Sequence, residues 1–188
     1  MGFETKNVST RSTTPLGNPC YRECNGAFLL THAAMHQGMV ALMNAMMPWP
    51  MKQNFRKYVV PWTVFTDPPV SAVGMTDREL QDSGIKYETI HVKYEDYGVA
   101  IAEAVETGFV EVRASKSGKI YGVTIVGEGS GEMINEWALA IQRGVNLRHI
   151  MMLQHTMGFL TKRAGDTWMM NRMKSSWLRW LMQRMYRL

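Results

Sequence analysis

The chain has 188 residues, of which 46% are hydrophobic and 20% charged, and its formal net charge is +5 at pH 7. This length suits one domain with extensions, and the composition excludes wholesale disorder. No apolar run approaches the roughly 18 residues that a membrane span needs. The polar amino terminus has no signal-peptide core, so the cytoplasm is the expected compartment.

Residues 1–58 are expected to form a flexible lead, one helix and a linker. The helix is predicted over residues 31–46, because apolar residues recur there at helical spacing. Pro48 and Pro50 end it sharply. The predicted apolar stripe of this helix consists of Met35, Met39, Leu42, Met43 and Met46.

Cys20 and Cys24 form a C-x-x-x-C pair before this helix. The pair could be a redox dithiol. Together with His32 and His36 it lacks the ligand spacing of a tetrahedral zinc site. Free thiols in a surface turn are the favoured interpretation, and no metal site is predicted.

The central part of the chain, residues 59–168, is expected to be one α+β domain. Its predicted fold is an antiparallel sheet of about four or five strands flanked by helices, with an N-terminal helix and a C-terminal helical extension. Alternating apolar residues predict strands over 87–94, 109–114 and 120–127. A polar turn at residues 116–119 joins the last two as a hairpin. Residues 97–106 fit a helix or a strand.

Two helices in this part have clear ends. Thr76 and Glu79 form a capping box that opens a short helix, which Gly84 stops. A longer helix is predicted over residues 132–143, with Gly144 as its stop. Its apolar residues at helical spacing are Ile134, Trp137, Ala138 and Ile141.

A glycine-rich turn, Gly127–Glu132, lies between the last predicted strand and the longer helix. A dinucleotide fingerprint occupies such a place. Glu132 stands where the third glycine would be, and its charge would repel a pyrophosphate. Residues 151–153 also lack the acidic side chain that binds the ribose. The glycines are therefore interpreted as a turn that lets the helix pack closely.

Two motifs of the central part resemble a known family. They are V-P-W-T-V-F-T-D-P at residues 60–68, followed by A-V-G-M-T at 72–76, and the segment 118–144. Both are similar to the C-terminal dimerisation domain of the flavin-dependent pyridine nucleotide-disulfide oxidoreductases, which include dihydrolipoamide dehydrogenase, glutathione reductase and mercuric reductase. The resemblance spans residues 59–168. It implies a homodimer whose two-fold interface uses Ile134, Trp137, Ala138 and Ile141.

The residues before the central part resemble the end of the same family's flavin domain. The resemblance places Glu23 on an aspartate that binds the ribityl chain of FAD, and Thr31 and His32 on the opening of a helix that faces the flavin ring. Arg22 stands on a glycine position where backbone passes close to the cofactor. These flavin contacts are degenerate, so the chain alone is expected to bind no FAD. Separate flavin and nicotinamide domains are candidate partners.

The family's catalytic dyad is a histidine in a His-Pro-Thr motif and a following glutamate. Aligned on Thr156, Gln154 takes the histidine position, His155 the proline position and Phe159 the glutamate position. Glutamine cannot carry a proton and phenylalanine cannot orient an imidazole, so the dyad is not intact. His155 is shifted by one residue to another face, and we expect it to be a surface or packing residue rather than a relocated base.

Residues 169–188 predict a basic amphipathic helix. Its apolar arc is Trp177, Leu178, Leu181, Met182, Met185 and Leu188. This arc is expected to dock on the domain or on a second copy, with contact to an anionic membrane surface as the alternative. No nucleic-acid partner is expected.

The expected function is that of a dimerisation-domain fragment of an FAD-dependent NAD(P)H disulfide oxidoreductase, inactive alone because the flavin motif and the redox cysteines are missing. The alternatives are a stand-alone, non-catalytic homodimer and a membrane-surface adaptor.

Overall fold

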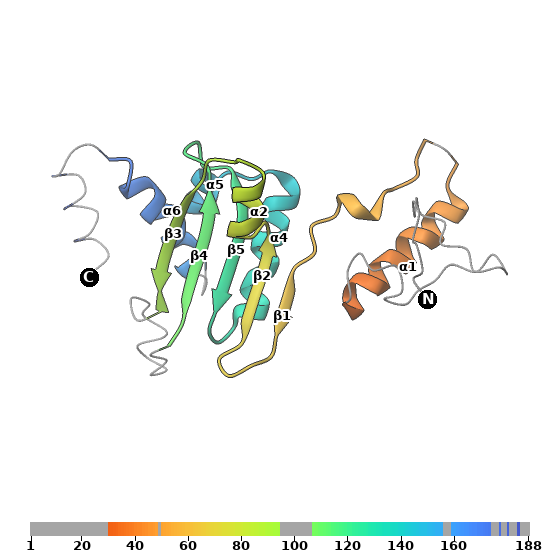
Figure 1. The fold of residues 1–188 in the computed structure, drawn as a ribbon, viewed down its shortest axis with the longest axis horizontal. Helices are drawn as coiled ribbons and strands as arrows, with labels where there is room; N and C mark the ends of the chain where they lie inside the picture. Colours follow the sequence, from red (N-terminus) through yellow and green to blue (C-terminus); the bar gives the residue numbers. More distant parts are fainter. Residues whose placement is uncertain are drawn as a thin grey trace. The chain divides into compact units, whose positions relative to one another are not determined.

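The computed structural model describes residues 30–48, 50–94, 107–155 and 159–173, together with 177, 180 and 184 (Figure 1). The chain divides into two compact units, Met1–Val60 and Pro61–Leu188, and each is described by itself. The expectations for the lead, for Cys20, Cys24, Arg22 and Glu23, and for residues 97–106 lie outside the described residues. No helix in the described ranges is long and apolar enough to cross a membrane.

The first unit contains helix α1, Thr31–Met46, and the 3₁₀ helix η2, Phe55–Lys57. The helix has the predicted bounds. Its expected apolar stripe is not the buried face, because Met35, Met39, Leu42 and Met46 are each more than half exposed. The buried residues are instead mostly small ones: Ala33, Ala34, Gly38, Val40 and Asn44. The small-residue face therefore packs within the unit and the methionine face is left uncovered.

Asn44 explains which face of α1 is covered. Its side-chain amide donates to the carbonyl of Gln53 at 2.8 Å and accepts from the amide of Gln53 at 2.7 Å. The linker is thus fixed against the helix on the side of Asn44. Tyr58 also meets His36 edge to face, with ring centres 4.5 Å apart.

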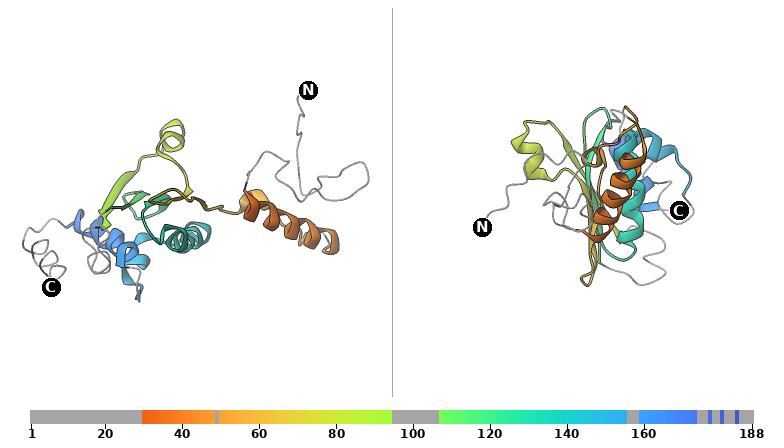
Figure 2. Two further views of the ribbon diagram at one scale, coloured as in Figure 1. Left: turned by 90° about the horizontal axis from the view of Figure 1, so that it is seen from below. Right: turned by 90° about the vertical axis from the view of Figure 1, so that its right-hand side faces the viewer.

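The second unit is a five-stranded antiparallel sheet in the order β1-β2-β5-β4-β3. The strands are β1 Trp62–Val64, β2 Val70–Gly74, β3 Glu88–Lys93, β4 Phe109–Ala114 and β5 Ile120–Val126. The helices are α2 Asp77–Asp82, α4 Ser130–Arg143, α5 Leu147–Met152 and α6 Phe159–Met170. Figures 1 and 2 show α4, α5 and α6 on one face of the sheet and α2 on the other. The predicted α+β fold with an antiparallel sheet is confirmed.

The core lies between the sheet and the helices α4, α5 and α6. Ile90, Val112 and Val123 are register partners across three strands, so their side chains point to the same face. The core residues in this layer are Val73, Ile90, Val92, Val110, Val112, Val123, Ile125, Ile134, Trp137, Ala140, Leu147, Ile150, Leu160, Ala164 and Trp168. The strands that alternation predicted over 87–94, 109–114 and 120–127 supply most of the sheet residues in this layer.

Gly122 shows how closely the chain passes over β5. A Cβ atom at this position would lie 2.1 Å from the carbonyl oxygen of Met75. Real Cβ atoms do not approach backbone this closely, so only glycine fits where β2 leads into α2.

Helix α2 covers part of the opposite sheet face through an ionic contact. Thr76 and Glu79 form the predicted capping box. The first helical residue, Asp77, accepts a hydrogen bond from Arg113 Nε on β4 at 2.6 Å. Arg113 also donates to Thr124 at 3.0 Å and to Glu111. Its guanidinium is buried, and these three partners satisfy it.

Asp77 should make the stability of the second unit depend on acid. Partial burial raises the pKa of Asp77, but hydrogen bonds from Arg113 and Tyr87 and the charge of Arg113 outweigh burial and hold it below the ordinary value of 3.8. A carboxyl with a lowered folded-state pKa stabilises the fold above its unfolded pKa, and this contribution is lost as the pH falls through the folded pKa. Stability from this group is therefore lost below about pH 4.

We expect Asp77→Asn to lower the free energy of unfolding at pH 7 by about 1 kcal/mol, a value reduced because the carboxylate is partly exposed. Below about pH 4, the free energy of unfolding of this variant should fall less steeply with decreasing pH than that of the wild type. Urea unfolding at several pH values measures both effects. Asp82→Asn is the matched control, since Asp82 lies on the same helix and faces only the exposed Arg78 at 3.9 Å. An equal change in both variants would contradict the role of Arg113.

The two edges of the sheet differ in length. The edge strand β1 has only three residues, and β3 at the other edge has six. On the face opposite the core, β3 presents the polar side chains Thr89, His91 and Lys93. The ring of His91 stacks on that of Phe109 in β4, with centres 5.0 Å apart.

Helix α4 begins after Gly129 and ends at Gly144, both in the left-handed conformation with φ of 71° and 65°. Gly144 is the predicted stop. The helix carries an apolar face toward β2 and β5 and a polar face that includes Glu132, Glu136 and Arg143. Its orientation decides which of its residues a partner can reach.

Candidate functional site

Two residues expected to bear on function, Gln154 and His155, lie where the segment after α5 meets the outer side of α4. We call this region the α4–α5 surface and define it by Glu136, Leu139, Met152, Leu153, Gln154 and His155. Leu139 follows Glu136 by three residues on α4, so both side chains lie on the same side of the helix. The other four residues form the end of α5 and the segment after it.

A contact between His155 and Glu136 holds these two segments together. Nε2 of His155 lies 2.8 Å from a carboxylate oxygen of Glu136, and Nδ1 lies 3.1 Å from the carbonyl oxygen of Leu153. The side chain of His155 is only 7% exposed and that of Glu136 is 29% exposed. Both ring nitrogens thus face oxygen atoms of the chain itself. This arrangement is that of a structural contact, which tethers α4 to the segment after α5. A catalytic base would need a ring nitrogen that can reach a substrate.

The structure describes the two dyad positions, Gln154 and Phe159, and the neighbouring His155 to different extents. Gln154 is exposed next to the tether. Phe159 is the first residue of α6, and its side chain lies outside the described part of the structure. His155 contacts Glu136 of α4 through Nε2 and Leu153 of its own segment through Nδ1. The structure therefore brings His155 together with a carboxylate that the sequence motif did not indicate.

Sequence reasoning missed Glu136 for a clear reason. The partner of His155 lies nineteen residues earlier in the chain, whereas the family motif places its carboxylate a few residues later. Helical spacing could have put Glu136 on the polar side of α4. The tertiary structure brings the histidine to it.

Large apolar side chains lie uncovered beside this tether. Leu139 is 61% exposed, and Met152 and Leu153 are also at least half exposed. Exposed apolar side chains gathered in one patch are typical of surfaces that contact another protein chain.

The four expected interface residues on α4 differ in their burial. Ile134 and Trp137 are buried in the core of their own chain, with Trp137 0% exposed. Their side chains pack against the sheet and are not available to a second copy. Ala138 and Ile141 are half-buried, and the δ-methyl of Ile141 lies near Gly74. The exposed large apolar residue of α4 is Leu139, which was not among the four expected interface residues.

Two of the three degenerate flavin positions lie at the start of α1. Thr31 and His32 are exposed there, and Glu23 lies outside the described residues. Within the described ranges, no group of three or more His, Cys, Asp or Glu could hold a metal ion.

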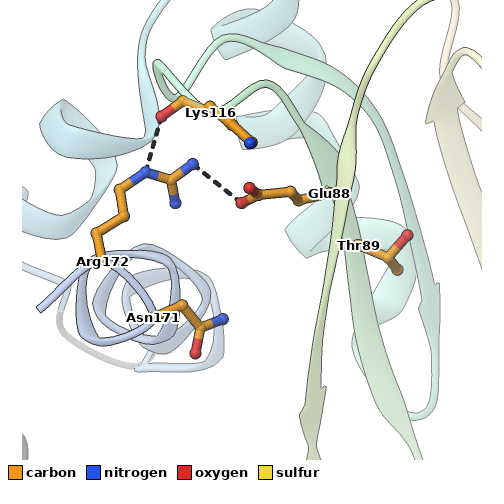
Figure 3. A pocket seen from close by; sticks show the side chains of 5 residues that line it. All are labelled: Glu88, Thr89, Lys116, Asn171 and Arg172. Carbon is orange, nitrogen blue, oxygen red and sulfur yellow. Dashed lines mark hydrogen bonds and ion pairs between the residues drawn. The ribbon is translucent and has the colours of Figure 1, made fainter. Parts of the chain in front are cut away.

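A shallow pocket of about 600 Å³ lies beside β3 and the end of α6 (Figure 3). Arg172 crosses it and donates from Nε to the carbonyl of Lys116 at 2.7 Å and from a terminal nitrogen to Glu88 at 2.9 Å. Its guanidinium also lies 4.3 Å from the ring centre of Trp168. The cation is thus engaged in joining α6 to β3 and to the β4–β5 hairpin, and the pocket has a structural role.

Comparison with known proteins assigns residues 60–160 to the family described as pyridine nucleotide-disulphide oxidoreductase, dimerisation domain. The dihydrolipoyl dehydrogenase of Vibrio parahaemolyticus is 32% identical over 141 residues, and that of Buchnera aphidicola is 30% identical over the same length. Both matches cover 74% of this chain and 29% of the relative, so the chain spans less than a third of their length.

Solved structures show the same fold. The HOCl-induced flavoprotein disulfide reductase RclA from Escherichia coli superposes with a TM-score of 0.67 at 19% identity. This match covers 77% of the present chain and 33% of RclA.

Proposed function

The chain belongs to the pyridine nucleotide-disulphide oxidoreductase dimerisation-domain family, and from that premise we propose that it forms a homodimer through the α4–α5 surface. The observation that carries the proposal is the uncovered apolar group Leu139, Met152 and Leu153, which flanks the tether between His155 and Glu136. In a two-fold dimer the same patch is buried twice, so a few apolar residues contribute on both sides.

Charge supports this choice of surface. Glu136 already has a hydrogen-bond partner in His155, so its burial at an interface does not leave a carboxylate without a partner. Glu132 and Arg143 flank the apolar residues on the outer side of α4. Such an apolar centre with a charged rim is the usual anatomy of an interface between protein chains.

We expect Leu139→Lys to weaken the homodimer at least about tenfold, because each copy would bring an unpaired charge to the same patch. Leu139 is exposed, so the folded monomer should keep its stability. Analytical ultracentrifugation over a concentration series gives the dissociation constant, and circular dichroism reports the fold.

Phe65→Lys is the matched control for this prediction. Phe65 is an exposed apolar residue in the β1–β2 connection, and it receives the same charge outside the residues that define the α4–α5 surface. A wild-type chain that sediments as a monomer at every concentration would refute the homodimer. If both substitutions weaken the homodimer equally, the α4–α5 surface is not the dimer interface.

We propose that these 188 residues have no reductase activity alone and that they work together with flavin- and nicotinamide-binding domains. Support comes from the length comparison, since the chain spans 29% of the dehydrogenases it matches. Further support comes from the uncovered face of α1, where Met35, Met39, Leu42 and Met46 recur at i, i+4, i+7 and i+11. A helix face of this kind is typical of contact with another polypeptide.

The absorbance spectrum of the purified chain tests this part of the proposal. No visible flavin band is expected from the chain alone, and a bound flavin would contradict the interpretation of Glu23, Thr31 and His32 as degenerate contacts. A stand-alone, non-catalytic homodimer is the second candidate. Failure of the chain to bind any flavin polypeptide, with the homodimer intact, would favour it.

A further inference from the structure

The net charge of the chain is concentrated at its carboxyl end. Residues 167–188 contain five of the 21 Lys and Arg residues and no Asp or Glu. Residues 1–166 contain sixteen basic and sixteen acidic residues and are therefore neutral overall. The formal charge of +5 thus belongs entirely to this last segment.

Two tryptophans in the same segment are exposed. Trp177 is 63% exposed and Trp180 is 52% exposed, whereas Trp137 and Trp168 are buried in the core. Positions 177, 180 and 184 are helical, and their spacings of three and four residues are those of a single helix face. The expected docking of the apolar arc on the domain is therefore not seen for Trp177, the one residue of that arc that the structure describes.

Arg184 lies against one of these rings. Its guanidinium carbon is 5.3 Å from the ring centre of Trp180, within the range of a cation–π contact. The contact keeps an apolar ring and a cation side by side on the same face. An indole and a guanidinium presented together match the boundary between the headgroups and the acyl chains of a bilayer.

We propose that the face formed by Trp177, Trp180 and Arg184 binds the surface of an anionic phospholipid bilayer. The tryptophans enter the headgroup region, where indole rings are favoured, and the five cations of the segment attract the lipid phosphates. The neutral remainder of the chain neither opposes nor adds to this attraction. The inference does not depend on the proposed homodimer or on any reductase activity.

A single-stranded nucleic acid is the competing ligand for exposed aromatic and basic residues. Binding to nucleic acid requires open ring faces on which successive bases stack. Arg184 covers one face of Trp180, so the rings do not form a continuous stacking platform. Membrane insertion requires only that the ring edge and the cation reach the interface together, and the observed contact satisfies this requirement.

The experiment uses the full chain with two kinds of vesicle, one of phosphatidylcholine alone and one in which about a third of the lipid is phosphatidylglycerol. Co-sedimentation measures partitioning, and tryptophan emission reports insertion. We expect at least about tenfold stronger binding to the anionic vesicles, a blue shift of the emission, and a loss of binding as salt increases.

Three sets of variants separate the aromatic and the ionic contributions. Trp177→Ser combined with Trp180→Ser should reduce partitioning at least about tenfold and abolish the blue shift, and Arg184→Gln alone should reduce partitioning about fivefold. Trp62→Ser and Arg78→Gln are the controls, since they change an exposed tryptophan and an exposed arginine elsewhere in the same unit. The controls should bind like the wild type, and thermal melting should show that all variants are folded.

Three outcomes would overturn the proposal. One is equal binding to both kinds of vesicle, and another is a loss of binding in the controls as large as in the tail variants. The third is a tail-dependent affinity for a fluorescent single-stranded oligonucleotide without affinity for anionic vesicles.

Discussion

Replacing Trp137 with alanine is expected to lower the free energy of unfolding by roughly 3 to 5 kcal/mol. The side chain is fully buried between α4 and the sheet and is the largest of the fully buried side chains in the described structure. Alanine would leave a cavity that the antiparallel strands cannot fill. Because domains of this size have only about 5 to 15 kcal/mol of stability, the variant should be close to unfolding at moderate temperature.

Two further substitutions serve as comparisons for the effect of Trp137→Ala on stability. Trp137→Phe should cost much less, because it retains an aromatic ring and removes an indole N–H that has no hydrogen-bond partner among the described residues. Trp62→Ala removes an exposed indole from β1 and should change stability little. Urea unfolding followed by circular dichroism compares the three variants. A folded but monomeric Trp137→Ala chain would show that this side chain acts at an interface, against its burial.

Restoring the catalytic dyad is expected to raise the rate of a complemented enzyme about 100-fold or more. The change is Gln154→His together with Phe159→Glu, tested with the flavin and nicotinamide portion of a dihydrolipoyl dehydrogenase that lacks its own dimerisation domain. The introduced imidazole can carry a proton and the introduced carboxylate can orient it, which Gln154 and Phe159 cannot do. The measurement is NADH oxidation coupled to reduction of a disulfide.

Controls for this prediction separate proton transfer from assembly. Gln154→Asn with Phe159→Gln changes the same positions without adding a titrating group, and it should leave the rate at the level of the unmodified chain. His155→Ala should not remove the gained activity, since the ring of His155 is engaged by Glu136 and Leu153. Activity of the unmodified chain that His155→Ala abolishes would instead identify His155 as the working base.

Features that depend on neighbouring residues could be predicted from the sequence. The capping box of Thr76 and Glu79 and the stop at Gly144 are local, because each satisfies backbone groups within one turn. The strands β3, β4 and β5 were also predictable, since alternation of apolar residues over six or seven positions leaves one face for a core.

Features that depend on what covers a surface could not be predicted. Periodicity identified an apolar face on α4 but could not tell whether the sheet of the same chain or a second copy covers it. On α1 the largest apolar residues predicted the wrong buried face. The hydrogen bonds between Asn44 and Gln53 hold the linker against the face that carries Asn44, and that face is the buried one. The contact of His155 with Glu136 joins residues nineteen positions apart in the chain, and no local motif encodes it.

The short and polar edges of the sheet have a consequence for aggregation. Unpaired backbone groups at a sheet edge are templates on which strands of other molecules can add. Here β1 presents only three residues, and β3 carries Lys93 and two other polar side chains on its uncovered face. A second copy therefore finds little backbone on which to extend the sheet. Refolding from denaturant at high protein concentration should return native chains rather than fibrils rich in intermolecular β-structure.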